Sequence, residues 1–312
     1  VKITIENNTY DNSNLLVETL SLTESLSSRS CFEFADVESS QIKFTLINDE
    51  SIPELTGKIA TIVLEVGTDT LPYGVYKLSV EKSGDLLLCT GLDLLYKLDV
   101  NVASWYNGLS YPITHKNMVI SLCTYVGLEH ELPISYTNHD IAITKSVNLS
   151  EITGREFLGY LNELACGWFT LNRLGKLVLV QLSSSELYPS ETLFPSTDIY
   201  PSGVGERYYP SMFAQENIDI SEFSSLEIDK LVIRSSDTDI GTIVGSGMNT
   251  YIIEGNILTF GFNASDRYNI ATEIFEVLSG IQYASVKGDF IGLPYLEKGD
   301  FIQVTDQDNH IG

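Results

Sequence analysis

The chain has 312 residues, of which 43% are hydrophobic, and a formal net charge of −24 at pH 7. At ~100–200 residues per domain this length predicts two or three domains, and the apolar content suffices for packed cores, which excludes bulk disorder. The strong acidity argues against a protein that binds nucleic-acid phosphates or docks on anionic lipid, because both partners need basic surfaces.

Short β-branched segments separated by turn residues dominate residues 1–102. Several of them alternate apolar and polar side chains in the two-residue period of a half-buried strand. The expected strands are Lys2–Glu6, Gln41–Ile47, Ile59–Val66, Val75–Glu81 and Leu86–Thr90. Strands at this spacing predict a first β-barrel or sandwich module over residues 1–102.

Residues 103–215 begin with a segment of helical periodicity. Thr114–Val126 carries apolar residues at the three- and four-residue spacing of a buried helix face. Thr114 is a suitable N-cap, and Gly127 is a suitable stop. The sequence therefore predicts a helix over this segment.

A second helix and a β-hairpin complete this predicted α/β insertion. Thr153 and Glu156 have the spacing of a capping box, in which each side chain satisfies a backbone amide of the other residue. A buried face of phenylalanine and leucine follows, and we expect the helix to end at Gly167. Two strands at 168–172 and 176–182 then flank a short loop, which predicts the hairpin.

Residues 183–215 are rich in serine, proline and tyrosine. Proline removes backbone donors, so this segment cannot form a core helix or a central strand. We expect either a long loop that its own aromatics pin to the chain or an interaction loop that packs on another subunit. The aromatics are Tyr188, Phe194, Tyr200, Tyr208, Tyr209 and Phe213.

Residues 216–312 return to β character and predict a second β module. One helix interrupts it, with Ser265 as the expected cap and a buried face that includes Ile270 and Ile274. The final segment reads as a strand that stops at its turn, so we expect the natural polypeptide to continue beyond Gly312. The expected strands are Ile228–Ser235, Thr250–Ile253, Ile257–Phe260, Gln282–Phe290 and Asp300–Thr305.

Residues that could carry chemistry are scattered. The four cysteines lack a CxxC pair and sit in apolar surroundings, which favours buried free thiols in a reducing compartment. His130 and His139 lie near acidic residues, which leaves a metal site or a solvated loop. The aspartates in 237–239 and 306–309 suit either calcium or tight turns.

No motif of a serine hydrolase, a P-loop nucleotide binder or a zinc protease occurs in the sequence. We therefore assign no catalytic, cofactor-binding or metal-binding residue. The sequence predicts a protein without enzymatic activity and without a cofactor.

Several segments, in an order that spans most of the chain, carry a family resemblance. They are Ser27–Ile47, Leu71–Val80, Cys89–Asp99, Ile152–Leu179, Asn256–Leu258 and Gly292–Asp300. The fourth segment matches best, with a helix, a glycine, an aromatic strand and a Gly-Lys-Leu turn. Together the segments resemble the hub proteins of phage tail tips and baseplates. The chain departs from the pattern at Leu92, where an aromatic is common, and at Ile257, where a proline is expected.

The resemblance implies a mainly β fold with two tube-forming β-barrel modules around a small α/β insertion. It also implies a homotrimer, whose ring joins a six-fold tail tube or a distal tail protein ring to a three-fold tip, fibre or spike protein. DNA would only pass through the lumen, without stable membrane binding, in a virion assembled in the bacterial cytoplasm. An acidic lumen would let DNA slide, because it does not hold phosphates.

Two other functions stay open. The chain could be the hub portion of a tail-associated peptidoglycan-degrading protein whose catalytic domain lies outside this sequence. It could also be a carbohydrate-binding module for host recognition, with Trp105 and Tyr106 stacking on sugars. The alternative for Trp105 is an anchor between the first module and the insertion.

Overall fold

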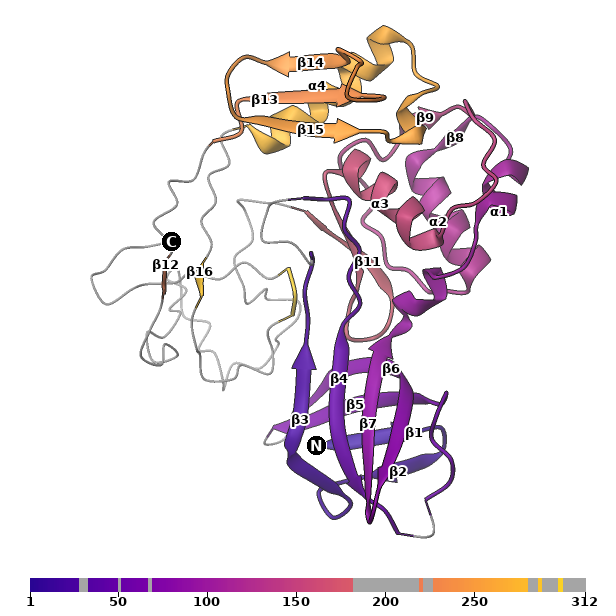
Figure 1. Ribbon diagram of the computed structural model, residues 1–312, viewed down its shortest axis with the longest axis vertical. Coiled ribbons are helices and arrows are strands. Elements are labelled where there is room, and N and C mark those ends of the chain that lie inside the picture. The colour runs from indigo at the N-terminus through magenta and orange to yellow at the C-terminus, as the bar shows by residue number, and fades with distance from the viewer. Residues whose placement is uncertain are drawn as a thin grey trace.

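Seven antiparallel strands form the largest sheet in the described part of the computed structural model (Figure 1). The structure describes residues 1–27, 33–49, 52–66, 69–181, 219–220, 227–279, 286–287 and 297–299. The strand order across the sheet is β2-β1-β5-β6-β7-β4-β3. The strands are β1 (Lys2–Ile5), β2 (Asn8–Tyr10), β3 (Leu15–Thr23), β4 (Gln41–Ile47), β5 (Ile59–Val66), β6 (Asp69–Ser83) and β7 (Leu86–Asp93).

The five strands expected in this region are confirmed, and β2 and β3 are additions. The register between β3 and β4 shifts between Leu16 and Ser21, and this irregularity hides the two-residue alternation of β3 from the sequence. The described strands leave the sheet open, with β2 and β3 as its edges. The predicted fold class, mainly β with some helices, is confirmed, whereas closure into barrels stays a prediction.

This sheet has its own hydrophobic core. Every second residue of β7 is buried, as the pleat of a strand requires, while Leu88 and Leu92 on the opposite face remain exposed. The core draws only on residues between Ile3 and Cys89. The sheet is therefore packed without help from the rest of the described chain.

The helical part of the chain follows directly after β7. Both predicted helix starts are confirmed, because the hydroxyl of Thr114 accepts from the Asn117 amide and the capping box at Thr153 is complete. The elements are η1 (Leu94–Leu98), α1 (Ala103–Gly108), β8 (Ile113–Thr114), α2 (His115–Val126), β9 (Ala142–Ile143), α3 (Gly154–Ala165), β10 (Gly167–Leu171) and β11 (Leu177–Gln181).

The end of α3 differs from the prediction by one residue. Cys166 closes the helix in a left-handed conformation with φ of 51°, and Gly167 already belongs to β10. A Cβ on Gly167 would lie 2.6 Å from the Val180 carbonyl oxygen of the paired strand. Close pairing of the hairpin, rather than helix termination, therefore requires the glycine.

A three-stranded sheet and one helix form the third part of the described chain. Helix α4 packs on one face of the sheet, whose order is β14-β13-β15. The strand β13 pairs with β14 antiparallel and with β15 in parallel. The elements are β13 (Lys230–Arg234), β14 (Thr242–Gly245), β15 (Thr250–Glu254), η3 (Ile257–Thr259) and α4 (Ala264–Leu278), and a separate pair joins β12 (Asp219–Ile220) to β16 (Val286–Lys287).

Two predictions in this part are wrong. The expected strand Ile257–Phe260 is the 3-10 helix η3, because the Asn256 side chain accepts from the Leu258 amide and starts a helical turn. The cap of α4 is Asn263 rather than Ser265, with Asn263 accepting from the Asp266 amide. The predicted strand at 282–290 is described only at 286–287, and the one at 300–305 lies outside the described residues.

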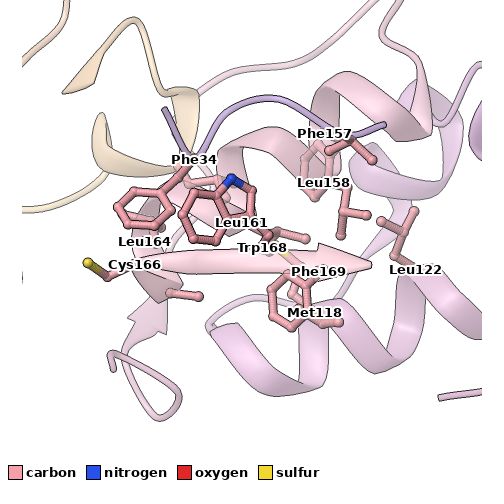
Figure 2. Packing of buried hydrophobic residues seen from close by; sticks show 14 of the residues in the cluster. Phe34, Met118, Leu122, Phe157, Leu158, Leu161, Leu164, Cys166, Trp168 and Phe169 are labelled. Carbon is pink, nitrogen blue, oxygen red and sulfur yellow. The ribbon is translucent and has the colours of Figure 1, made fainter. Parts of the chain in front are cut away.

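The helical part and the third part share one continuous hydrophobic core. Side chains from α2, α3, β10, β13 and α4 belong to the same buried cluster. Figure 2 shows its centre, where Phe34 lies beside Trp168 and Phe169 packs near Met118. No helix in the described part of the chain is long and apolar enough to cross a membrane.

Candidate functional site at the junction of the three parts

The candidate metal and calcium residues have structural roles. His139 lies with Nδ1 2.8 Å from the Tyr136 carbonyl oxygen, and His130 joins the backbone of Leu177 through an isolated bridge. Asp239 closes a tight turn, since its carboxylate accepts from the Ser235 and Gly241 amides at 3.0 Å. Those bonds lower the pKa of Asp239 to about 2. The described residues contain no group of three or more potential metal ligands.

The candidate sugar-stacking pair packs inside the helical part. Tyr106 is fully buried against Phe157. Trp105 is half-buried, donates from Nε1 to the Ser121 hydroxyl at 3.0 Å and meets Phe157 edge-on with ring centroids 5.2 Å apart. Trp105 packs α1 against α2 and α3, and Tyr106 packs it against α3. Trp105 is therefore an anchor inside the insertion, not one between the first module and the insertion.

The cysteines of the described chain are inert. Cys89, Cys123 and Cys166 are buried free thiols, as predicted, and burial raises the pKa of each to about 12. Cys31, the aromatics of 188–213 and the aspartates of 306–309 lie outside the described residues.

The link from β3 to β4 forms an arm, residues 33–40, that leaves the sheet and lies across the helical part. Phe34 at its start is fully buried, with its ring 4.6 Å from Trp168 and 5.9 Å from Tyr251. The Phe34 amide donates to the Tyr251 hydroxyl at 3.2 Å, and Trp168 donates from Nε1 to the Glu33 carbonyl at 2.9 Å. The arm therefore joins the sheet to both other parts.

Helix α3 is shaped to receive the arm. Gly159 faces Ala35, whose carbonyl oxygen would lie only 2.3 Å from a Cβ at that position. Arg155 donates from Nη1 to the Val37 carbonyl at 2.7 Å and also binds both carboxylate oxygens of Asp99, at 2.7 and 3.3 Å. One arginine therefore fixes the arm and the end of η1 to the same helix turn.

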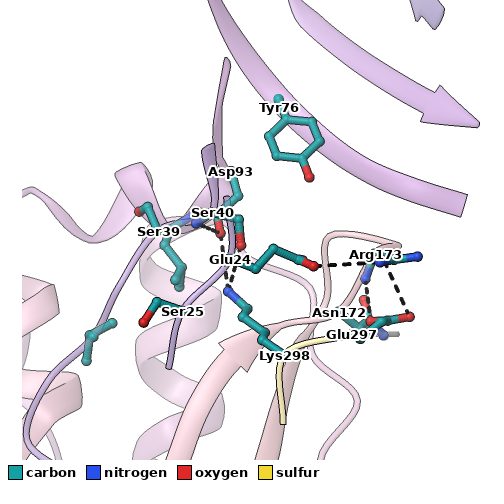
Figure 3. A network of polar contacts seen from close by, with 12 residues as sticks. Glu24, Ser25, Ser39, Ser40, Tyr76, Asp93, Asn172, Arg173, Glu297 and Lys298 are labelled. Carbon is teal, nitrogen blue, oxygen red and sulfur yellow. Dashed lines mark hydrogen bonds and ion pairs between the residues drawn. The ribbon is translucent and has the colours of Figure 1, made fainter. Parts of the chain in front are cut away.

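Beside the arm lies a cluster of charged side chains, which we call the charged clasp (Figure 3). It brings together the end of β3, the end of β7, the hairpin turn between β10 and β11, and the segment 297–299. Its members are Glu24, Asp93, Arg173, Glu297 and Lys298.

Asp93 is the centre of one half of the clasp. Its Oδ2 accepts from the Ser40 amide at 2.7 Å and lies 3.7 Å from Lys298 Nζ, while Oδ1 accepts from the Leu95 amide at 3.1 Å. Lys298 also donates to the Ser40 hydroxyl at 2.8 Å. The Asp93 and Lys298 side chains are only 6% and 4% exposed, so water screens this pair weakly.

Arg173 is the centre of the other half. Its guanidinium lies 3.6 Å from Glu24 and 4.0 Å from Glu297, and it covers the ring of Tyr73 at 4.7 Å. The Arg173 amide donates to Glu297 at 3.3 Å. Burial raises the pKa of Glu24 and lowers that of Lys298, and the opposite charges in the clasp counteract both shifts.

The charged clasp is closely packed. The cavity beside the clasp measures about 10 Å³, which is too small for a substrate. The clasp could not be predicted from the sequence, because its members are far apart in the chain. A weak signal is present, since Asp93, Arg173, Glu297 and Lys298 lie inside segments that carry the family resemblance.

Comparison with known proteins supports a fold assignment. No family model and no curated protein matches the chain. The solved prophage tail protein gp18 from Listeria monocytogenes EGD-e is 11% identical, covers 100% of this chain and 87% of its own, and superposes with a TM-score of 0.55. The 43 kDa tail protein of prophage MuSo2 from Shewanella oneidensis is 12% identical, with coverages of 88% and 78% and a TM-score of 0.50.

A tail protein from Neisseria meningitidis MC58 is also similar, at 13% identity and a TM-score of 0.45 over 81% of this chain and 70% of its own. At these identities the first two likenesses show the fold, and they show it over nearly the whole length of the chain. The chain thus shares the fold of these two prophage tail proteins.

Proposed function

We propose that this chain is a structural subunit of a phage-type tail, and specifically the hub of the tail tip or baseplate. The observation that carries the proposal is the fold likeness to a prophage tail protein over the full chain. The ordered sequence resemblance to tail hubs supports the same role from an independent direction. The subunit would act without enzymatic activity, as part of a virion.

We further propose that three copies form a ring that surrounds the DNA channel and joins the six-fold tube to the three-fold tip. Among the described strands, β2 and β3 form the edges of the large sheet, and this supports the arrangement because edge strands are suited to pairing with a neighbouring subunit. The charge of −24 supports a lumen that does not hold DNA.

The test is the solution mass of the full chain, measured by light scattering at several concentrations. We expect a stable species at three times the 34.6 kDa of one chain. A monomer at every concentration, and also after mixing with a matching tail-tube protein, would contradict the trimeric ring. Clearing of a cell-wall suspension by this chain would contradict a purely structural role.

A further inference from the structure

Neighbouring residues of opposite charge at 297 and 298 contact the two halves of the charged clasp. Lys298 contacts Asp93 at the end of β7 and Ser40, the last residue of the arm before β4. Glu297 contacts Arg173, which belongs to the hairpin turn. The segment 297–299 therefore makes two charge contacts with two separate structural elements.

We propose that Glu297 and Lys298 couple the position of the segment 297–299 to the joint between the large sheet and the helical part. The coupling passes through Asp93, whose carboxylate serves three groups at once. The oxygen that faces Lys298 also accepts from the Ser40 amide, and the other oxygen caps η1 at the Leu95 amide. Loss of the lysine charge therefore changes the hydrogen bonds at which β4 and η1 begin.

The Arg173 half gives the coupling a second and separate branch. The Glu297 carboxylate accepts a hydrogen bond from the Arg173 amide at 3.3 Å. Loss of this carboxylate therefore weakens a hydrogen bond of the hairpin turn and leaves the hydrogen bonds of Asp93 in place. The two halves are bridged by Glu24, whose carboxylate lies 3.6 Å from Arg173 and whose charge also acts on Lys298.

Charge and close backbone approach, rather than a large side chain, hold the segment in place. Gly299 has φ of 95°, and a Cβ there would lie 2.7 Å from the Val180 side chain on β11. Because breaking one partner of a buried ion pair leaves the other charge uncompensated, removal of a single charge is enough to disturb its half of the clasp. A displacement of the segment thereby reaches the sheet–helix joint.

The test is amide hydrogen exchange of the full chain, resolved for the amides of Ser40, Leu95 and Arg173. In Lys298→Met we expect exchange at Ser40 and Leu95 to rise at least tenfold, with Arg173 changed less than twofold. In Glu297→Met we expect the reverse pattern, because methionine removes both the charge and the oxygen that accepts from the Arg173 amide. Lys298→Arg retains the charge and should restore slow exchange at Ser40 and Leu95.

The matched control is Lys116→Met, because Lys116 also donates hydrogen bonds from Nζ, to the Pro133 and Ile134 carbonyls, but does so at an exposed site away from the clasp. Unchanged exchange at Ser40 and Leu95 in Lys298→Met would overturn the proposal, as would an equal rise across the core of the large sheet. Glu297→Met supplies the same test at Arg173 if the Lys298 variant does not fold.

Discussion

Two junctions hold the three parts together, and they use different kinds of contact. Besides the arm, the large sheet meets the helical part through charged side chains, with Asp93, Lys298 and Arg173 nearly excluded from water. The helical part meets the third part through one apolar core, in which Glu163 is a buried carboxyl on α3. The stability of a charged junction depends on each buried charge keeping a partner of opposite charge. The stability of an apolar junction depends on close packing and on buried ionisable groups that stay neutral.

Glu163 shows what the apolar junction does to an ionisable group. Its carboxylate accepts from Asn256 Nδ2 at 2.9 Å. Burial raises its pKa to about 7, the Asn256 hydrogen bond lowers it, and the nearby charge of Glu33 raises it further. In the charged junction, Asp93 instead faces a lysine. The same residue class is therefore a pH-sensitive group at one junction and an ion-pair partner at the other.

The largest loss of stability should come from deleting a buried ring in the apolar junction. Phe34→Ala removes a fully buried ring that contacts Trp168 and Tyr251. We expect the free energy of unfolding to fall by about 3–5 kcal/mol, the usual cost of deleting a buried phenylalanine. Denaturant titration measures it, and Leu88→Ala on the exposed sheet face is the control, expected within about 0.5 kcal/mol of the parent. A loss below about 1 kcal/mol for Phe34→Ala would show that the arm is not an anchor.

The next largest effect should come from the charged junction. Asp93→Asn keeps the shape of the side chain but removes the negative charge that Lys298 faces at 3.7 Å, and it weakens the cap of η1. We expect a loss of about 3 kcal/mol, typical of a broken buried pair. Lys58→Met breaks the exposed Lys58–Glu6 pair and should cost at most about 1 kcal/mol in the same titration. Equal losses of unfolding free energy for Asp93→Asn and Lys58→Met would mean that burial does not strengthen the ion pairs of the clasp.

Glu163→Gln should stabilise the protein, but only at neutral and alkaline pH. The folded-state pKa of Glu163, about 7, lies above its ordinary value of 4.5, so its stabilising contribution is complete below pH 4.5 and is lost as the pH rises through 7. Glutamine removes the charge and keeps an acceptor for Asn256. We expect a gain on the order of 2–3 kcal/mol at pH 8 and almost none at pH 4.

Thermal unfolding of the parent chain and of Glu163→Gln from pH 4 to pH 8 measures this difference in stability. Glu156→Gln is the matched control on the same helix, because Glu156 is exposed and its pKa is lowered by the Thr153 hydrogen bonds. That variant should lose stability rather than gain it at pH 8. A pH-independent difference for Glu163→Gln would contradict a buried carboxyl that titrates near neutrality.

The same contrast explains how much of the fold could be predicted from the sequence. Caps and alternation are local, so Thr114, the Thr153 box and the strand Gln41–Ile47 are in the structure as the sequence predicts. The strand β3 was missed because its register shifts, and η3 was misread because the Asn256 cap is a side-chain effect.

The junctions could not be predicted, because their contacts join residues that are distant in the chain. Phe34 contacts Trp168 across 134 positions, and Lys298 contacts Ser40 across 258. Neither pair has a local signature, and burial of a phenylalanine or a lysine depends on which surface the topology brings to it. The sequence therefore predicts the elements well and the contacts between them poorly.

The smallest effect concerns His115, which titrates in the opposite sense to Glu163 within the shared core. His115 is fully buried, with Nε2 3.0 Å from the Leu161 carbonyl and Nδ1 3.0 Å from the Tyr136 hydroxyl. The carbonyl can only accept, so Nε2 carries the proton and Nδ1 accepts from Tyr136. Burial lowers the pKa of His115 to about 4, which means that its contribution is complete above pH 6.5 and is lost as the pH falls toward 4.

Tyr136→Phe removes the donor to the neutral imidazole, so it should cost about 1 kcal/mol at pH 7 and less at pH 4, where the ring is partly protonated and no longer accepts. Tyr125→Phe on the half-exposed ring of α2 is the control and should change stability by less than about 0.5 kcal/mol at either pH. As the pH falls from 8 to 4, the contribution of Glu163 to the free energy of unfolding rises and that of His115 falls. In the parent chain the two pH dependences therefore oppose each other. The free energy of unfolding of Tyr136→Phe, measured at pH 7 and pH 4, reports on the contribution of His115 alone. A loss of stability that grows on acidification would contradict the assigned tautomer.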